Sequence, residues 1–256
     1  MHKDSKAFTL LFAAAVCGVC SIFVAGSAVS LRERQEENKL LDRQTKVLTV
    51  AGLISEGQVV EREVVPQLFE ANIVPVVIEL QSGEILPDVD VTTFDPVIEA
   101  RETSSSRLAP PNQAQVFRIP NRAMLYHVIE DGEIKSLVLP VEGKGLWSTL
   151  YGFLALSADT STVEGLIFYQ HLETPGLGGE VDNPSWRSKW PGQLVYNENW
   201  EPVIEVTKNA SGVHEIDALS GATITSNGVT YLLHFWLGEH GFGPYLDQYR
   251  AERGIQ

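Results

Sequence analysis

Cysteine is almost absent from this chain: only two occur in 256 residues, Cys17 and Cys20. Because both lie near the N-terminus, the rest of the chain can form neither a disulfide nor a thiolate-bound cluster. The CxxC spacing is compatible with a redox or metal pair. The neighbouring residues are all apolar, however, and we interpret the two cysteines as small side chains in a hydrophobic helix.

Basic residues are also scarce, with 19 Lys and Arg against 33 Asp and Glu, a net charge of −14. Binding to a nucleic-acid backbone depends on basic patches, and no zinc-finger, P-loop or basic-helix pattern occurs. The six histidines never show the H-E-x-x-H spacing of a zinc site. Ser220 is not in a G-x-S-x-G nucleophile elbow. We therefore expect no nucleic-acid partner, no metal ion and no catalytic residues of the hydrolase type.

Charge is missing from one long segment, residues 7–31, "AFTLLFAAAVCGVCSIFVAGSAVSL". As a helix these roughly 25 residues would extend about 37 Å, enough for a bilayer core of about 30 Å. A cleavable signal peptide, cut near 26–28, and lipid attachment at Cys20 are the alternatives. The run is longer than a typical signal core, so we predict a retained single-pass anchor. Positive charges on its two sides nearly balance, which leaves the orientation open with a lean towards an exported domain.

Changes of pattern along the chain predict four parts. Residues 1–31 form the N-terminal tail and transmembrane helix. Residues 32–54 alternate charged and apolar residues at helical spacing and are expected to continue it as a helical stalk. Residues 55–122 are less regular and are expected to form a peripheral α/β segment of the soluble domain. The strongest signals of a folded core lie in 123–256.

Strands dominate the predicted core. Asp131-Gly132 between two apolar runs is a strong hairpin signal, and residues 150–170 read as a second pair of strands. A further strand, "EPVIEVTK", ends at Lys208. Short helical signals follow Asn183, and an apolar helix ends at Gly238 or Gly241. No βαβ alternation is present, so the predicted fold class is α+β: a mostly antiparallel sheet with flanking helices.

Three segments of the core have the composition of ligand-binding loops. Two are rich in glycine, "EGKGLWS" at 142–148 and "ETPGLGGE" at 173–180. Glycine allows a backbone to approach a ligand closely, although neither loop matches a dinucleotide fingerprint. The third is "DALSGATITSNGV" at 217–229, which carries four hydroxyl residues before the apolar helix.

The hydroxyl residues of the third segment exceed what a helix cap requires. We expect Thr225 or Ser226 to cap the helix, and the first turn and helix dipole to form a site for a phosphate-like anion. The Gly-Ala step keeps the approach open. Ser220 and Thr223 are then available for the ligand, and one hydroxyl could carry it covalently.

The heptapeptide "DALSGAT", Asp217 to Thr223, resembles the flavinylation motif of the FMN-binding domain family. That resemblance implies FMN esterified through its phosphate to Thr223, the last threonine of the motif, with Thr225 as the nearest alternative. It also implies a separate flavin transferase that uses FAD.

The similarity extends along the chain. "HLETPGLGGEV", "GLWS", "GFGPYL" and the single N-terminal span are similar to the C subunits of the Na+-translocating NADH:quinone reductases. The resemblance implies an electron-transfer subunit, with FMN bound by residues 123–256, in a complex that passes electrons from NADH to ubiquinone and exports sodium. It also implies partner subunits and a soluble domain on the periplasmic side of a bacterial inner membrane. The flavin subunit of an RNF-type ferredoxin:NAD+ complex and a cofactor-free anchored binding or assembly protein are the alternatives.

The candidate cofactor-binding residues come from these three loops and one strand end. Trp147, Thr174 and Leu177 are the candidates for contacts with the flavin ring, and Lys208 could neutralise the phosphate. The full set is Asp217, Ser220, Gly221, Ala222, Thr223, Thr225, Trp147, Glu173, Thr174, Leu177, Gly178 and Lys208.

Overall fold

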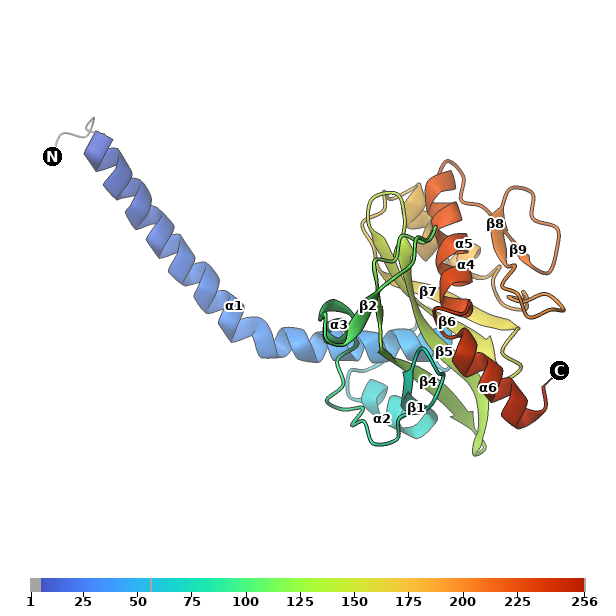
Figure 1. The fold of residues 1–256 in the computed structure, drawn as a ribbon. Coiled ribbons are helices and arrows are strands. Elements are labelled where there is room, and N and C mark those ends of the chain that lie inside the picture. Colours follow the sequence, from blue (N-terminus) through green and yellow to red (C-terminus); the bar gives the residue numbers. More distant parts are fainter. Residues whose placement is uncertain (1–5, 56, 256) are drawn as a thin grey trace. The chain divides into compact units, whose positions relative to one another are not determined.

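The computed structural model describes residues 6–55 and 57–255. Its chain divides into two compact units, Met1–Arg43 and Gln44–Gln256. Figure 1 shows the course of the chain through both. We describe each unit by itself.

The first unit is the main part of helix α1, Lys6–Val50. It contains the predicted apolar span, whose large side chains such as Leu10, Ile22 and Phe23 are exposed. Cys17 and Cys20 lie on this helix as free, exposed thiols. Among the described residues, α1 is the one helix long and apolar enough to cross a membrane. Helix α1 continues without a break from this span to Val50, through most of the predicted stalk.

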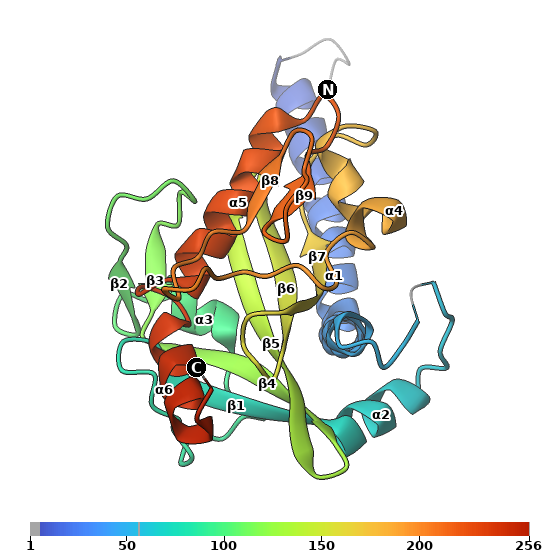
Figure 2. The same ribbon diagram turned by 90° about the vertical axis from the view of Figure 1, so that its right-hand side faces the viewer.

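The second unit is built around a five-stranded sheet with the order β1-β4-β5-β6-β7, in which every neighbouring pair is antiparallel. Figure 2 shows this sheet together with the helices on either side. The mostly antiparallel α+β fold expected from the sequence is confirmed. The strands are β1 Ile73–Glu79, β4 Arg122–Glu130, β5 Glu133–Lys144, β6 Thr149–Ser157 and β7 Val163–Gln170.

The predicted hairpin joins β4 and β5 through Asp131 and Gly132. Their φ angles are +53° and +84°. Both residues therefore have the left-handed backbone conformation that two-residue hairpin turns require, and Asp-Gly is a favoured pair for such turns. The second predicted pair of strands is β6 and β7.

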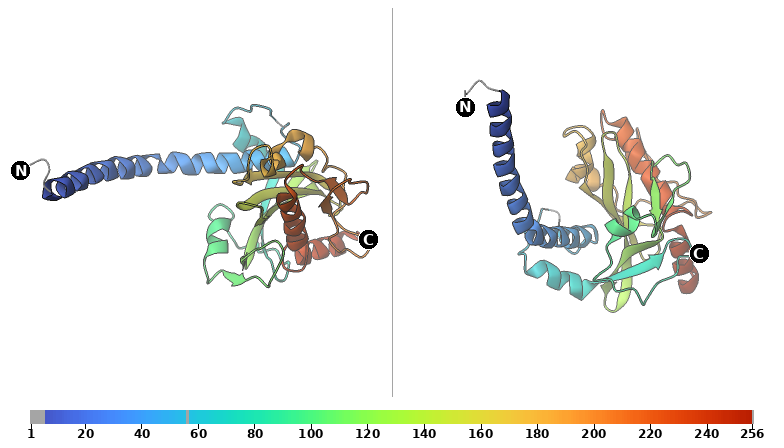
Figure 3. Two further views of the ribbon diagram at one scale, coloured as in Figure 1. Left: turned by 90° about the horizontal axis from the view of Figure 1, so that it is seen from above. Right: turned by 60° about the vertical axis from the view of Figure 1, so that its left-hand side comes forward.

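Helices cover both faces of the sheet (Figure 3). On one face lie the last turns of α1, from Gln44 onwards, and α2, Val64–Asn72. Tyr126 of β4 packs there between Phe69 of α2 and Phe153 of β6, with ring centroids 6.0 Å away in each case. The other face is covered by α5, Thr223–Leu237, whose Leu232 and Leu233 are fully buried in the core.

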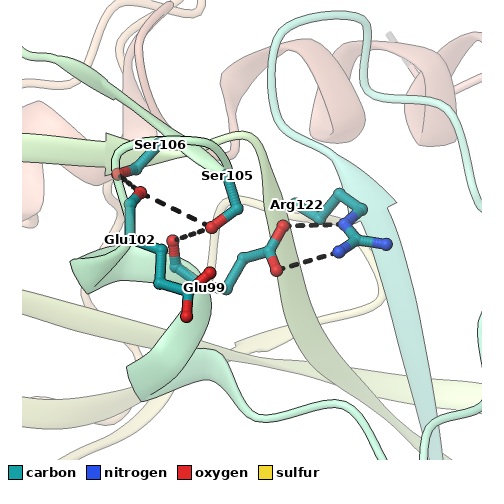
Figure 4. Close-up of polar contacts among 5 residues, drawn as sticks. All are labelled: Glu99, Glu102, Ser105, Ser106 and Arg122. Carbon is teal, nitrogen blue, oxygen red and sulfur yellow. Dashed lines mark hydrogen bonds and ion pairs between the residues drawn. The ribbon is translucent and has the colours of Figure 1, made fainter.

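A small polar cluster ties residues 95–120 to the sheet (Figure 4). It joins α3, Pro96–Arg101, to the ribbon of β2, Ser106–Leu108, and β3, Arg118–Pro120. Glu99 of α3 is 6% exposed, and its carboxylate accepts two hydrogen bonds from Arg122 of β4, at 2.7 and 2.9 Å. Ser105 and Ser106 donate to backbone carbonyls of the α3 segment.

The remaining elements follow β7. They are the 3-10 helix η1 Gly178–Asp182, α4 Pro184–Arg187, the parallel pair β8 Glu205–Thr207 and β9 Glu215–Asp217, and α6 Gly243–Arg253. The predicted strand ending at Lys208 is thus only three residues long. Helix α6 was not predicted. It is held by Arg250, which donates to Thr160 and lies over the ring of Trp200.

Candidate functional site

Helix α5 begins earlier than the sequence suggested. Its first residue is Thr223, and the N-cap, Ala222, makes no side-chain hydrogen bond. The prediction that Thr225 or Ser226 caps the helix is wrong, because both lie inside the first turn and are 0% and 1% exposed. The end of the helix at Leu237, followed by Gly238, is as predicted.

The four hydroxyl groups separate into a buried pair and an exposed pair. Ser226 Oγ accepts a hydrogen bond from the N–H of Leu219 at 3.0 Å. Thr225 Oγ1 donates to Glu173 Oε2 at 2.7 Å. Ser220 and Thr223 are exposed. Since residues two apart in a helix point about 200° away from each other, burial of Thr225 directs Thr223 outward.

The N-terminus of α5 offers free backbone donors. The first hydrogen bond of the helix runs from the N–H of Ser226 to the carbonyl of Ala222. Within residues 6–55 and 57–255, the N–H groups of Thr223, Ile224 and Thr225 have no acceptor. Together with the helix dipole, these three donors form a site suited to a phosphate group beside the Thr223 hydroxyl.

The turn before α5 depends on glycine. Gly221 has a φ of +72°, a left-handed conformation that side chains disfavour. A β-carbon there would also lie 3.1 Å from Leu177 Cδ2. The second glycine-rich loop therefore reaches the Ser-Gly-Ala turn directly.

Glu173 connects all three predicted loops. One carboxylate oxygen accepts from the N–H groups of Trp147 (2.9 Å) and Ser148 (3.3 Å), and the other from the N–H of Leu146 (3.3 Å) and the hydroxyl of Thr225 (2.7 Å). The residues involved are far apart in sequence and come from loop 142–148, loop 173–180 and the first turn of α5. The three segments thus form one site.

Two glycines make room for that carboxylate. A β-carbon at Gly145 would lie 2.6 Å from Glu173 Oε1, and one at Gly178 would lie 2.5 Å from Glu173 Oε2. Larger residues at either position would displace the glutamate. Gly178 is therefore placed at the site by packing on Glu173.

The Glu173 carboxylate is stabilised in its charged form. Burial alone would raise the pKa of Glu173, but the hydrogen bonds from Thr225, Trp147, Ser148 and Leu146 together bring this pKa below its ordinary value. Each donor favours the ionised acceptor, so the side chain is an anion at neutral pH.

α5 lies directly against the end of β5. A β-carbon at Gly228 would collide with the carbonyl oxygen of Lys144, and one at Gly143 would lie 2.5 Å from the Leu232 side chain. The same part of β5 is also bonded to the loop before β3, since the N–H of Lys144 donates to the carbonyl of Ala114 at 2.8 Å. This contact was not predicted from the sequence.

The predicted ring contacts are on the surface of the site. Trp147 is 65% and Leu177 44% exposed, and Thr174 is exposed. Three further large apolar side chains in or directly next to these segments are exposed and were not predicted: Leu146, Leu172 and Ile224. Their signal in the sequence was apolar residues inside loops that are otherwise polar or glycine-rich.

Asp217 and Lys208 lie at the N-terminal end of the motif. The Asp217 carboxylate is paired with Lys189 Nζ at 2.7 Å, which lowers the pKa of Asp217, and its carbonyl accepts from Trp186 Nε1 at 2.8 Å. Both partners flank the end of α4, so Asp217 anchors the motif to that helix. Lys208 is exposed directly after β8, and the β8–β9 register places it next to Ala218.

An exposed hydroxyl at a helix N-terminus, free N–H donors and exposed apolar side chains on an antiparallel α+β domain are the features of a domain that binds a phosphate-bearing cofactor. The FMN-binding domain family matches residues 145–238, which include all three loops except the first residues of loop 142–148.

Relatives similar over almost the whole chain identify the family. The C subunit of the Na(+)-translocating NADH-quinone reductase of Pseudomonas aeruginosa is 44% identical over 97% of this chain and 98% of its own length. The protein of the same name from Yersinia pestis is 44% identical over 97% and 95%. The crystal structure of Shewanella oneidensis NqrC has a TM-score of 0.77 and 32% identity, over 85% of this chain and 99% of that one. This chain belongs to the family formed by the C subunits of the Na(+)-translocating NADH-quinone reductases.

Proposed function

We propose that this chain carries FMN covalently, as a phosphoester of Thr223, and serves as an electron-transfer subunit of a Na+-translocating NADH:ubiquinone oxidoreductase. The observation that carries the proposal is the opposite placement of the two candidate acceptors. Thr223 is exposed at the first position of α5, whereas Thr225 is fully buried with its hydroxyl bonded to Glu173. An enzyme that modifies the folded domain could reach only the first.

The residues present fit the chemistry of FMN. The N–H groups of Thr223 to Thr225 can bind the phosphate. The exposed Lys208, next to Ala218 of the motif, supplies a positive charge. Trp147 and Leu177 offer apolar surface for the isoalloxazine, with Thr174 beside them. Bound FMN would accept and release electrons. The protein's part is to fix the phosphate, orient the ring and limit its contact with water.

The names of the relatives support a role within a complex. They are named as subunits, so we propose the other subunits of the same reductase as partners and a flavin transferase as the enzyme that attaches FMN. Helix α1 would anchor the chain in a bacterial inner membrane, with the Gln44–Gln256 unit on the periplasmic side. A covalent linkage suits that location, because a flavin held only by noncovalent contacts could be lost there.

The proposal is tested by the mass of the full chain after expression with a flavin transferase. We expect the denatured wild-type chain to stay yellow, to carry the added mass of one FMN and to be modified on the peptide containing Thr223. Thr223→Val should abolish the attachment, because valine has no hydroxyl.

The matched control is Thr225→Val, two residues away, which should leave the attachment largely intact. A colourless wild-type chain would indicate a cofactor-free binding protein, and modification at Thr225 would refute the assigned acceptor.

A further inference from the structure

Glu173 differs from an ordinary cofactor contact, because its carboxylate is buried and already saturated with protein donors. The residue is 5% exposed. Its hydrogen bonds come from three backbone N–H groups and one hydroxyl, all of which are neutral. The influences that set its pKa, among the described residues, are burial and these bonds, with no cation among them. The negative charge is therefore held in place without being cancelled.

The Glu173 carboxylate is hydrogen-bonded to two separate parts of the site, the first turn of α5 and the loop at Trp147. Through Thr225 the carboxylate is fixed to the first turn of α5, two residues from the exposed Thr223. Through the N–H groups of Trp147 and its neighbours it is fixed to the loop with the exposed apolar side chains. Rotation or displacement of either segment would break bonds to the same two oxygens.

We infer that Glu173 is the positioning residue of the flavin site: it fixes loop 145–148 against the N-terminus of α5 and places an uncancelled negative charge at the first turn of the helix that begins with the attachment point. The inference rests on the proposed function and assigns Glu173 a role in setting the properties of the flavin rather than in its attachment. A fixed negative charge opposes the addition of electrons to a nearby group. Glu173 should accordingly lower the reduction potential of the bound flavin.

The first test is Glu173→Gln in the full chain, loaded with FMN by the transferase. Glutamine keeps the shape but loses the charge, and its amide NH2 cannot accept a hydrogen bond. We expect flavin to remain on Thr223, since the hydrogen bonds to the Glu173 carboxylate come, among the described residues, from Leu146, Trp147, Ser148 and Thr225 and not from Thr223. The midpoint potential should become more positive. Hydrogen exchange of the peptide covering 145–149 should accelerate by about tenfold or more, as expected for the loss of hydrogen bonds to a charged acceptor.

Glu133→Gln is the charge-matched control. Glu133 is exposed at the start of β5, eleven residues from Lys144 at the site end of the same strand, or about 36 Å at the rise of a strand. The change of charge is the same in both variants. If the potential shifted as much in Glu133→Gln as in Glu173→Gln, the effect would not depend on the position of Glu173.

Thr225→Val and Thr225→Ser test the same inference independently, even if Glu173→Gln fails to fold. Valine removes one donor and leaves the carboxylate less neutralised, so the potential should become more negative, opposite to Glu173→Gln. Serine keeps the hydroxyl and should retain the wild-type potential. A purely structural role would move both Glu173→Gln and Thr225→Val in the same direction.

Three results would overturn the inference: flavin-loaded Glu173→Gln with unchanged potential and exchange, shifts of equal sign in Glu173→Gln and Thr225→Val, or a folded Glu173→Gln that takes up no flavin. If the wild-type chain itself carries no flavin, the proposed function fails instead. The exchange measurement on the unloaded protein would still test whether Glu173 holds the loop.

Discussion

The second unit contains two buried glutamates that meet the cost of burial in different ways. Glu99 is 6% exposed and is paired with Arg122 through two hydrogen bonds. Glu173 is 5% exposed and is surrounded by neutral donors. A buried carboxylate needs either a cation or a full set of hydrogen bonds. The first solution cancels the charge and fastens one segment to another, whereas the second preserves the charge at the place where the loops of the site converge.

The largest effect on stability is expected from breaking the cation-balanced pair. Arg122→Ala leaves the Glu99 carboxylate buried without its partner and should lower the free energy of unfolding by about 2 kcal/mol. This is less than for a fully buried pair, because Arg122 is partly exposed to water. Urea unfolding of the full chain, followed by a signal from the Gln44–Gln256 unit, would measure this. The double variant Glu99→Gln/Arg122→Met, which removes both charges, should recover much of the loss. Equal instability of the single and double variants would show that packing, not charge, is responsible.

A smaller effect is expected at the neutral-donor site. Thr225→Val removes one of four hydrogen bonds to Glu173 and leaves the shape of the side chain, so the free energy of unfolding should fall by about 1 kcal/mol. Thr225→Ser, measured in the same urea series, should remain close to wild type. If the serine variant is as unstable as the valine variant, the methyl group rather than the hydroxyl matters.

The smallest effect is on the pH dependence of stability. The pKa of Glu173 is lower in the folded protein than its ordinary value of 4.5. Its contribution to stability is therefore complete above about pH 4.5 and is lost as the pH falls through the folded pKa. Between pH 6 and pH 3 the free energy of unfolding should fall further in the wild type than in Glu173→Gln, because the glutamine side chain has no titratable group. Urea unfolding at each pH would measure both proteins, and an equal fall of the unfolding free energy in the two would contradict this prediction.

The sequence was informative where the signal is local. Asp131-Gly132 predicted the hairpin, and the glycine-rich loops and the hydroxyl segment predicted the parts of the site. The start of α5 was misplaced because Thr225 and Ser226 are good capping residues. In the fold Thr225 is instead buried and donates to Glu173, a tertiary contact that local sequence does not reveal.

Two features could not be predicted because they depend on distant contacts. Glu173 meets Trp147 and Thr225, which are separated from it by 26 and 52 residues, and no local pattern relates such positions. Helix α6 has few apolar residues, and it is held by the buried Tyr245, Leu246 and Tyr249. It is also held by Arg250, a residue that sequence patterns assign to the surface.

The close packing of α5 on β5 has a mechanical consequence. No methyl group fits at Gly228, because the carbonyl of Lys144 occupies the space. A larger residue there would push the helix off the strand, and since a helix moves as one stiff body, the displacement would reach its first residue. Position 228 faces the end of β5 and the start of the glycine-rich loop at Gly145, so a single added carbon there would increase the distance between this loop and the N-terminus of α5.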